Sequence, residues 1–146
     1  MKNIAKRFIC RSLILAMLAL LLPTGAGTLT VRAYSGGDGT EDNPYLISSA
    51  EDMIELATAV NGGNSYSGVY FAVANDIDLE GCEENQWTPI ASSWSTPFRG
   101  TFNGCGYVIS GLYINNGSDF QGLFGCLNNY GSILNLGVSG SVRGHN

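Results

Sequence analysis

The stretch that decides the fold runs from Phe98 to Gly140 and contains two similar blocks. The first reads Phe98-Arg-Gly-Thr-Phe-Asn-Gly-Cys105 and continues with Ile109-Ser-Gly-Leu-Tyr-Ile114. The second reads Phe120-Gln-Gly-Leu-Phe-Gly-Cys126 and continues with Ile133-Leu-Asn-Leu-Gly-Val138. Short strand-like pieces separated by glycine turns, repeated at a period of this size, are typical of coiled stacks of parallel strands. We therefore expect an all-β fold, a right-handed parallel β-helix of a few coils.

The spacing of the two blocks predicts which residues stack. Phe98, Gly100 and Phe102 recur at Phe120, Gly122 and Phe124, and the apolar positions that follow recur at nearly the same spacing. This gives repeat units of about 98–119 and 120–142, and we expect Phe102 to lie over Phe124 and Leu112 over Leu136. One coil alone cannot offset the entropy of ordering its backbone, so the coils must stack to be stable.

Residues 1–33 have the pattern of a secretory signal peptide. Basic residues precede an apolar run at 13–22, and small residues follow, with the best cleavage site after Ala33. The run is shorter than the roughly 20 apolar residues of a membrane span, although a retained anchor helix is the alternative. The predicted mature chain is thus a single domain of residues 34–146, and no membrane insertion is expected after the leader is removed.

Loss of the leader leaves a strongly acidic chain. Arg99 and Arg143 are the only basic side chains among residues 34–146, against all twelve acidic residues, a formal net charge of −10. Nucleic acids are poor partners for such a surface, because their binding requires neutralisation of phosphates by Lys or Arg.

The cysteines leave an ambiguity. The predicted mature chain contains Cys82, Cys105 and Cys126, and the last two lie at nearly the same phase of the repeat. Adjacent coils are close enough for a disulfide between them, but two small apolar residues stacked in a ladder are the simpler interpretation of the spacing. A zinc site has no support from the cysteine and histidine spacing.

One helix is expected, at about 49–61. Ser48 and Glu51 have the spacing of a capping box, and Gly62-Gly63 is a helix-ending signal. Between them an apolar stripe follows helical spacing, formed by Met53, Leu56, Ala57 and Val60. We expect this amphipathic helix to cap the first coil rather than to bind a partner or a membrane, because its other face is acidic.

Six motifs in order resemble a known family. They are Asn43-Pro-Tyr-Leu-Ile-Ser-Ser-Ala-Glu-Asp-Met, Asn75-Asp-Ile-Asp-Leu, Trp87-Thr-Pro-Ile, Phe98-Arg-Gly-Thr-Phe-Asn-Gly, Ile109-Ser-Gly-Leu-Tyr-Ile and Gly122-Leu-Phe-Gly125. Residues 36–140 resemble the N-terminal segment of bacterial secreted proteins with GLUG-type repeats. The resemblance implies a right-handed parallel β-helix in adhesin-like surface proteins or in non-catalytic parts of surface peptidases, with no known catalytic residues in this segment.

Candidates for catalysis are few. Asp76 and Asp78 are the only plausible carboxylate pair for sugar hydrolysis, and a weak calcium site there is a second alternative. The simpler interpretation is that both bond loop amides. His145 is the sole histidine and has no partner in the sequence, so Ser-His-Asp or Cys-His chemistry is unsupported. Trp94 and Tyr113 could stack on sugars, although partial burial in the core is the simpler role.

The sequence therefore predicts a non-enzymatic, secreted or cell-surface module with an adhesin-like binding or structural role. We expect no catalytic, cofactor-binding or metal-ligating residues, a host or bacterial surface glycan or protein as partner, and further repeats beyond a truncated C-terminus. The alternative is a fragment or appendage of a carbohydrate-active or peptidase surface enzyme.

Overall fold

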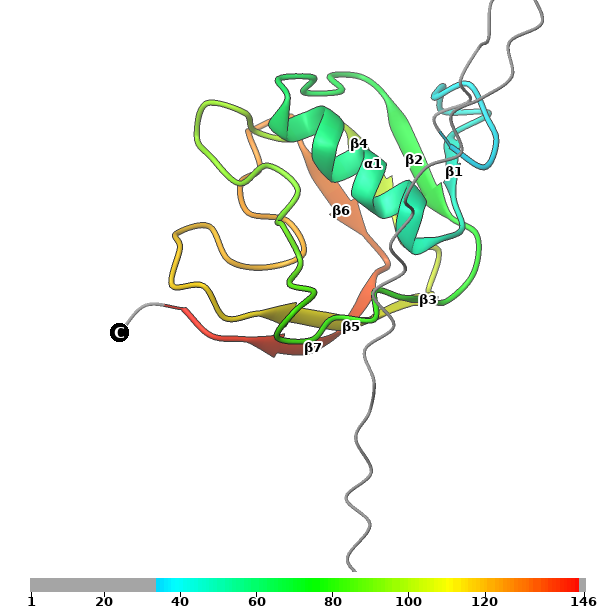
Figure 1. Cartoon of the computed structure of the whole chain (residues 1–146). Helices are drawn as coiled ribbons and strands as arrows, with labels where there is room; N and C mark the ends of the chain where they lie inside the picture. Colours follow the sequence, from blue (N-terminus) through cyan, green and yellow to red (C-terminus); the bar gives the residue numbers. More distant parts are fainter. Residues whose placement is uncertain (1–33, 145–146) are drawn as a thin grey trace, which may run out of the picture.

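The computed structural model describes residues 34–144 and places seven strands and one helix among them (Figure 1). The predicted leader and His145 lie outside the described residues. Every strand pairing is parallel, so the expected strand-rich, parallel architecture with one helix is confirmed in outline.

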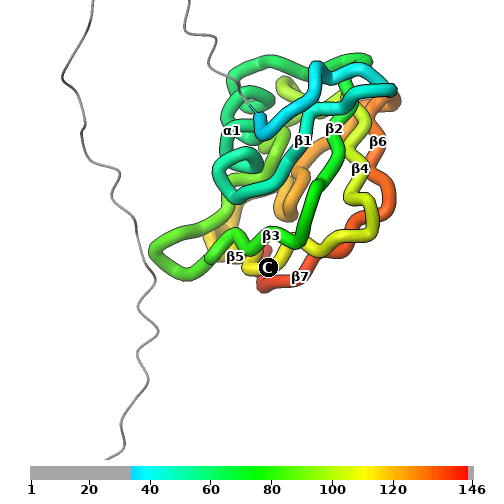
Figure 2. The backbone as a smooth tube through the Cα atoms, turned by 90° about the vertical axis from the view of Figure 1, so that its right-hand side faces the viewer, coloured from blue at the N-terminus to red at the C-terminus, as the bar shows by residue number. Residues whose placement is uncertain are grey.

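The strands form two parallel sheets, and from β2 onward the chain visits them in alternation. The four-stranded sheet has the order β1-β2-β4-β6, and the three-stranded sheet has the order β3-β5-β7. Figure 2 shows the four-stranded sheet with colours advancing in sequence order across it, and the three-stranded sheet beside it. The bounds are β1 Tyr45–Ile47, β2 Tyr70–Val73, β3 Ile77–Asp78, β4 Thr101–Asn103, β5 Val108–Ile114, β6 Ser132–Leu134 and β7 Gly137–Val142.

From β2 to β7 the chain adds strands to the two sheets in turn, and successive steps along the four-stranded sheet can be compared. Phe71 pairs with Phe102 and Phe102 pairs with Ile133, so two successive steps along the four-stranded sheet are equal in sequence length. Outside the two sheets, two isolated parallel bridges join segment 90–98 to segment 124–127: Ile90 pairs with Phe124, and Phe98 pairs with Leu127. We call these two segments together the bridge side.

The stacking register predicted from the two sequence blocks is wrong. Paired residues are separated by more positions in the sequence than the equivalent residues of the two blocks are. The second Phe-Gly-Phe block therefore does not lie over the first block; it lies on the bridge side. Phe102 does contact Phe124, with ring centroids 5.2 Å apart, but its strand partner is Ile133. The observed partners of the other predicted positions are Ile109 with Val138, Leu112 with Gly140, Ile114 with Val142 and Phe98 with Leu127.

Helix α1, Ala50–Asn61, buries the predicted apolar stripe of Met53, Leu56, Ala57 and Val60. Its N-cap is Ser49 and not Ser48: Ser49 has extended backbone angles, and its hydroxyl accepts a hydrogen bond from the amide of Asp52 at 3.2 Å. The predicted cap at Ser48 is therefore wrong by one residue, and the predicted capping box with Glu51 does not form: the Asp52 carboxylate instead accepts from the amide of Ser48 at 2.8 Å. At the other end, the amide of Gly62 donates to the carbonyl of Thr58, as expected for a helix terminated by glycine.

Large apolar side chains fill the interior between the sheets, the bridge side and α1. Phe71, Phe98 and Phe102 are essentially inaccessible to solvent, and their aromatic neighbours include Phe124. The two cysteines that the repeat placed in phase are both free: Cys126 is buried, but Cys105 is exposed on a turn with a φ of 53°. The predicted disulfide and the predicted cysteine ladder are thus both wrong, for the same reason as the register.

Candidate functional site

An apolar concavity lies between helix α1 and the segment that follows β3. It has a volume of about 440 Å³. One wall is the outer face of α1, and the other is the chain from Leu79 to Thr88. The lining residues are Ala50, Ile54, Ala57, Thr58, Asn61, Leu79, Gly81, Asn85, Gln86, Trp87 and Thr88. We call this concavity the helix groove.

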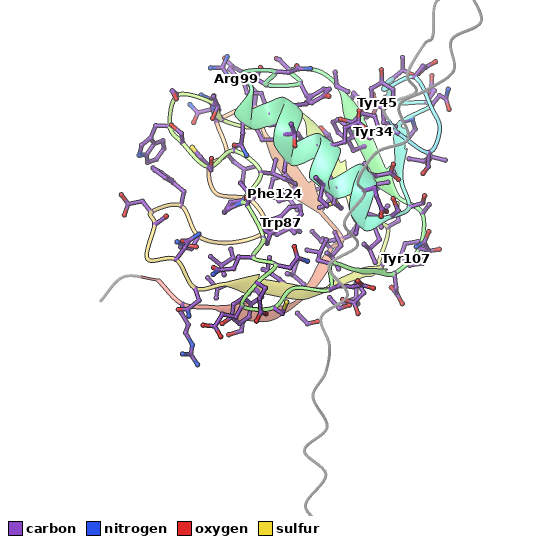
Figure 3. The ribbon with its side chains drawn as sticks, in the orientation of Figure 1. Tyr34, Tyr45, Trp87, Arg99, Tyr107 and Phe124 are labelled. Atoms are coloured by element: carbon purple, nitrogen blue, oxygen red, sulfur yellow. The ribbon has the colours of Figure 1, made fainter. Side chains whose placement is uncertain are left out.

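Trp87 fixes the floor of the helix groove. Its indole Nε1 donates to the carbonyl of Leu123 at 3.1 Å, and its backbone amide donates to the carbonyl of Tyr113 at 2.8 Å. Only 7% of the residue is exposed. Figure 3 shows Trp87 and Phe124 below α1, in the interior of the molecule. The wall therefore belongs to the packed core and is not a loose loop.

Two asparagines hold α1 in place above this wall. At its C-terminal end, Asn61 donates to the carbonyl of Pro89 at 3.0 Å and accepts from the amide and hydroxyl of Ser92. Near its N-terminal end, Asn75 donates to the carbonyl of Ser48 at 3.1 Å. Side-chain amides can bond two groups at once, so each asparagine links the helix region to a neighbouring segment.

Beyond the N-terminal half of α1 the helix groove opens into an acidic depression. The two share Ala50, Ile54, Leu79 and Asn85. The acidic residues that line the depression are Glu51, Asp76, Asp78, Glu80 and Glu84. None of its lining residues is basic.

The two candidate carboxylates bond backbone amides. Asp76 Oδ1 accepts from the amide of Val108 at 2.8 Å, and Asp78 Oδ1 accepts from the amide of Glu80 at 2.9 Å. The interpretation that the carboxylates satisfy loop amides is confirmed for Asp78, whereas Asp76 accepts from the amide of the first residue of strand β5. Asp76 thereby fixes the start of β5, and Asp78 stabilises the turn that leads into the helix-groove wall.

The two aromatic residues considered for sugar stacking differ in exposure. Trp94 is 75% exposed and packs edge-to-face on Phe120, with ring centroids 5.2 Å apart. Tyr113 is half-buried on β5. Neither lines the helix groove or the acidic depression, so the structure does not bring the predicted aromatic candidates to either concavity.

The sequence-based predictions missed the residues that form the helix groove. Ile54 is the informative one: it is 55% exposed and lies on α1 outside the buried stripe. An isoleucine on the otherwise polar face of an amphipathic helix is visible in the sequence and could have indicated this surface. Asn61, Asn85 and Gln86 gave no comparable signal, because exposed amides are common in loops and at helix ends.

The resolved pKa shifts lie away from the helix groove. Burial raises the pKa of the Tyr34 phenol well above its usual range, and the hydrogen bond with the Tyr66 hydroxyl, at 2.7 Å, adds to the shift. Hydrogen bonds from the Thr40 hydroxyl and amide lower the pKa of Asp38. Tyr34 lies beside Tyr45 near β1, as Figure 3 shows.

Across residues 34–144, no group of three or more His, Cys, Asp or Glu side chains is arranged to hold a metal ion. The helix in this part of the chain is too short and too polar to cross a membrane. The suggested calcium site at Asp76 and Asp78 stays a prediction.

Comparison with known proteins gives two informative similarities. The chain is 32% identical over 137 residues to "Putative Gly-rich membrane protein" of Evansella cellulosilytica, a match that covers 91% of this chain and 15% of that protein. It is also 35% identical over 118 residues to halomucin of Haloquadratum walsbyi, covering 78% of this chain and 1% of halomucin. This chain thus corresponds to a small part of each relative. No protein-family model matches it, and no solved structure does.

Proposed function

We propose that this chain is a non-catalytic module of a secreted or cell-surface protein, built as a right-handed parallel β-helix of the GLUG-repeat kind. Its role in this proposal is adhesin-like binding or structural extension of a surface protein. The predicted leader directs the chain out of the cytoplasm, and α1 caps its first coil.

The observation that carries this proposal is the equal step from β2 to β4 and from β4 to β6 in the four-stranded sheet. Two successive steps of equal sequence length place Phe71, Phe102 and Ile133 in one row, and the first two are buried. Rows of inward apolar side chains at a fixed step are the packing rule of solenoid proteins, in which each coil contacts only its neighbours. Such a scaffold supports a long, repetitive surface protein.

The relatives support the surface role. One is named as a membrane protein and the other as halomucin, and both are much longer than this chain. A module that represents a small part of a long protein contributes length or a binding surface. The formal charge of −10 on residues 34–146 agrees with an exposed, well-solvated surface.

The helix groove is the proposed place for a glycan or protein ligand. It combines an apolar strip, formed by Ile54 and Leu79, with the amides of Asn85 and Gln86. Ligand sites commonly combine apolar lining with a few polar groups that fix orientation. The volume of the groove, about 440 Å³, lies within the range of small-ligand sites.

The proposal is tested by applying the purified full-length chain to a glycan array and, in parallel, to polysaccharide and peptide substrates. Binding without release of reducing ends or peptides is expected. Ile54→Arg, which fills the helix groove, should abolish the binding. Tyr130→Arg, a substitution at a 77% exposed aromatic outside the groove, should not. Cleavage of a substrate by the wild-type chain would overturn the non-catalytic role.

The alternative of an enzyme fragment depends on Asp76 and Asp78, which line the same acidic depression. If cleavage is found, Asp78→Asn is the informative variant, because an asparagine oxygen can still accept from the amide of Glu80. Retained cleavage in that variant would remove the carboxylate pair as the source of the activity.

A further inference from the structure

The apolar interior is open at one end of the molecule. On the three-stranded sheet, Ile77 and Ile109 are 4% and 0% exposed, but the next partner in their row, Val138, is 47% exposed. Ile114 is fully buried, whereas its partner Val142 is 44% exposed. The end formed by β6, β7 and Leu127 of the bridge side is here called the open end.

The opposite end is covered by the chain itself. The amide of Ser35 donates to the carbonyl of Leu46, the amide of Leu46 donates to the carbonyl of Gly36, and the amide of Tyr70 donates to the carbonyl of Gly39. Residues 35–39 thus occupy the outer edge of β1. Below them, Tyr34 packs against Tyr45 and Phe71. This contrast leaves β6 and β7 as edge strands without a cover among the described residues.

Charge distinguishes the open end from the rest of the surface. All twelve acidic residues precede Phe120, and residues 120–144 carry a single charged side chain, Arg143. Residues 34–144 hold all twelve acidic side chains but only two basic ones, Arg99 and Arg143, so these parts of two copies repel each other at most orientations. They repel least when the uncharged ends face each other, because this arrangement puts the acidic surfaces farthest apart.

We propose that a second copy of this chain covers the open end, with the two open ends facing each other across a two-fold axis. A two-fold axis runs identical strands antiparallel, so β7 of one copy pairs with β7 of the other. β7 suits this contact, since its sequence Gly137-Val-Ser-Gly-Ser-Val142 has small residues that allow close backbone approach. The apolar ends of the rows, Val138, Val142, Leu127 and Ile133, then become buried between the copies.

This inference does not depend on the surface role proposed above. It depends on the parallel-strand fold and on the uncharged open end. Loss of ligand binding would contradict the surface role and leave the dimer untouched, whereas a monomeric chain would contradict the dimer and leave the surface role untouched.

The test is the mass of the purified full-length chain in sedimentation experiments from about 1 µM to about 200 µM, the range suited to an interface of modest area. We expect a concentration-dependent dimer that tightens when salt screens the acidic surfaces. Val138→Lys should weaken the dimer at least tenfold. The control Leu46→Lys, placed at a 37% exposed position on the covered edge strand β1, should leave it unchanged.

A measurement on the unaltered chain guards against a variant that fails to fold. Backbone amides of β7 should exchange more slowly with solvent at high than at low protein concentration, and amides of β1 should not change. A chain that stays monomeric throughout overturns the proposal and leaves the open end to a further coil of a longer polypeptide. Open-ended filaments, or a dimer weakened by Leu46→Lys, would also overturn it, because both require a head-to-tail contact.

Discussion

Replacement of Phe102 by alanine tests whether the rows of inward side chains hold the fold together. Phe102 is fully buried, pairs with Phe71 on one side and Ile133 on the other, and contacts the ring of Phe124 at 5.2 Å. An aromatic side chain buries about 150–250 Å², which corresponds to about 4–6 kcal/mol of transfer free energy. Alanine keeps part of this burial, so we expect the free energy of unfolding to fall by about 3–5 kcal/mol.

The assay is urea unfolding of the wild type, Phe102→Ala and the matched variant Ile133→Ala, followed by far-ultraviolet circular dichroism. Ile133 belongs to the same row but is half-buried at the open end, so its truncation should cost about 1 kcal/mol. The reasoning would be refuted if the two variants lost the same free energy of unfolding, or if Phe102→Ala lost less than about 1 kcal/mol. Either result would mean that Phe102, inside the row, contributes no more burial than Ile133 at the open end.

Three further predictions concern local features. Asp52→Asn should lower the free energy of unfolding by about 1–3 kcal/mol, measured by thermal or urea unfolding. The substitution weakens the hydrogen bonds that Asp52 Oδ2 accepts from the amide of Ser48 and the hydroxyl of Ser35. An unchanged stability would contradict this role. Gly111→Ala should lower the free energy of unfolding by about 1–3 kcal/mol, because the φ of Gly111 is +68° and the added Cβ would overlap with the carboxylate of Asp78. The control Gly106→Ala, with a φ of +85° and open space around the added Cβ, should cost only the backbone strain of about 1 kcal/mol. Equal costs for the two variants would contradict the clash. Because the pKa of Tyr34 is raised, the folded state keeps the phenol proton at a pH at which the unfolded chain releases it. The contribution of Tyr34 to stability is therefore complete below the unfolded pKa of about 10. As the pH rises above that value, this contribution falls by at most about 1.4 kcal/mol per pH unit. Stability measured from pH 8 to about pH 11 should therefore fall less steeply for Tyr34→Phe than for the wild type, and identical slopes would contradict the shift.

Local signals in the sequence predicted the local structure well. The apolar stripe of Met53, Leu56, Ala57 and Val60 predicted the buried face of α1, because helical spacing of apolar residues has a single simple explanation. The N-cap was misplaced by one residue, since Ser48 and Ser49 are chemically equivalent candidates. In the structure the buried side chain of Asp52 accepts from the amide of Ser48, and the amide of Asp52 donates to the hydroxyl of Ser49, which makes Ser49 the N-cap. The burial of Asp52 is not visible in the sequence.

The helix groove was beyond prediction for a different reason. Its walls come from α1 and from residues 79–88, and their approach depends on bonds such as Asn61 with Pro89 and Trp87 with Leu123. These contacts join residues 28 and 36 positions apart. The single visible trace was Ile54, an apolar residue on the polar face of the helix.

The stacking register failed because two similar motifs need not pair with each other in a chain that passes in turn through two parallel sheets and the bridge side. Each side needs a bulky apolar residue flanked by a small one where the chain turns, so the pattern Phe-x-Gly-x-Phe suits more than one side. The block at Phe98 leads into β4, whereas the block at Phe120 ends on the bridge side, where Phe124 pairs with Ile90. The two blocks therefore lie on different sides of the structure, with β5 between them in the sequence, and the true step joins Phe102 to Ile133, a pair that no motif match would select. It follows that the period of such a fold is better inferred from a complete circuit of inward apolar positions than from its most similar pair of motifs.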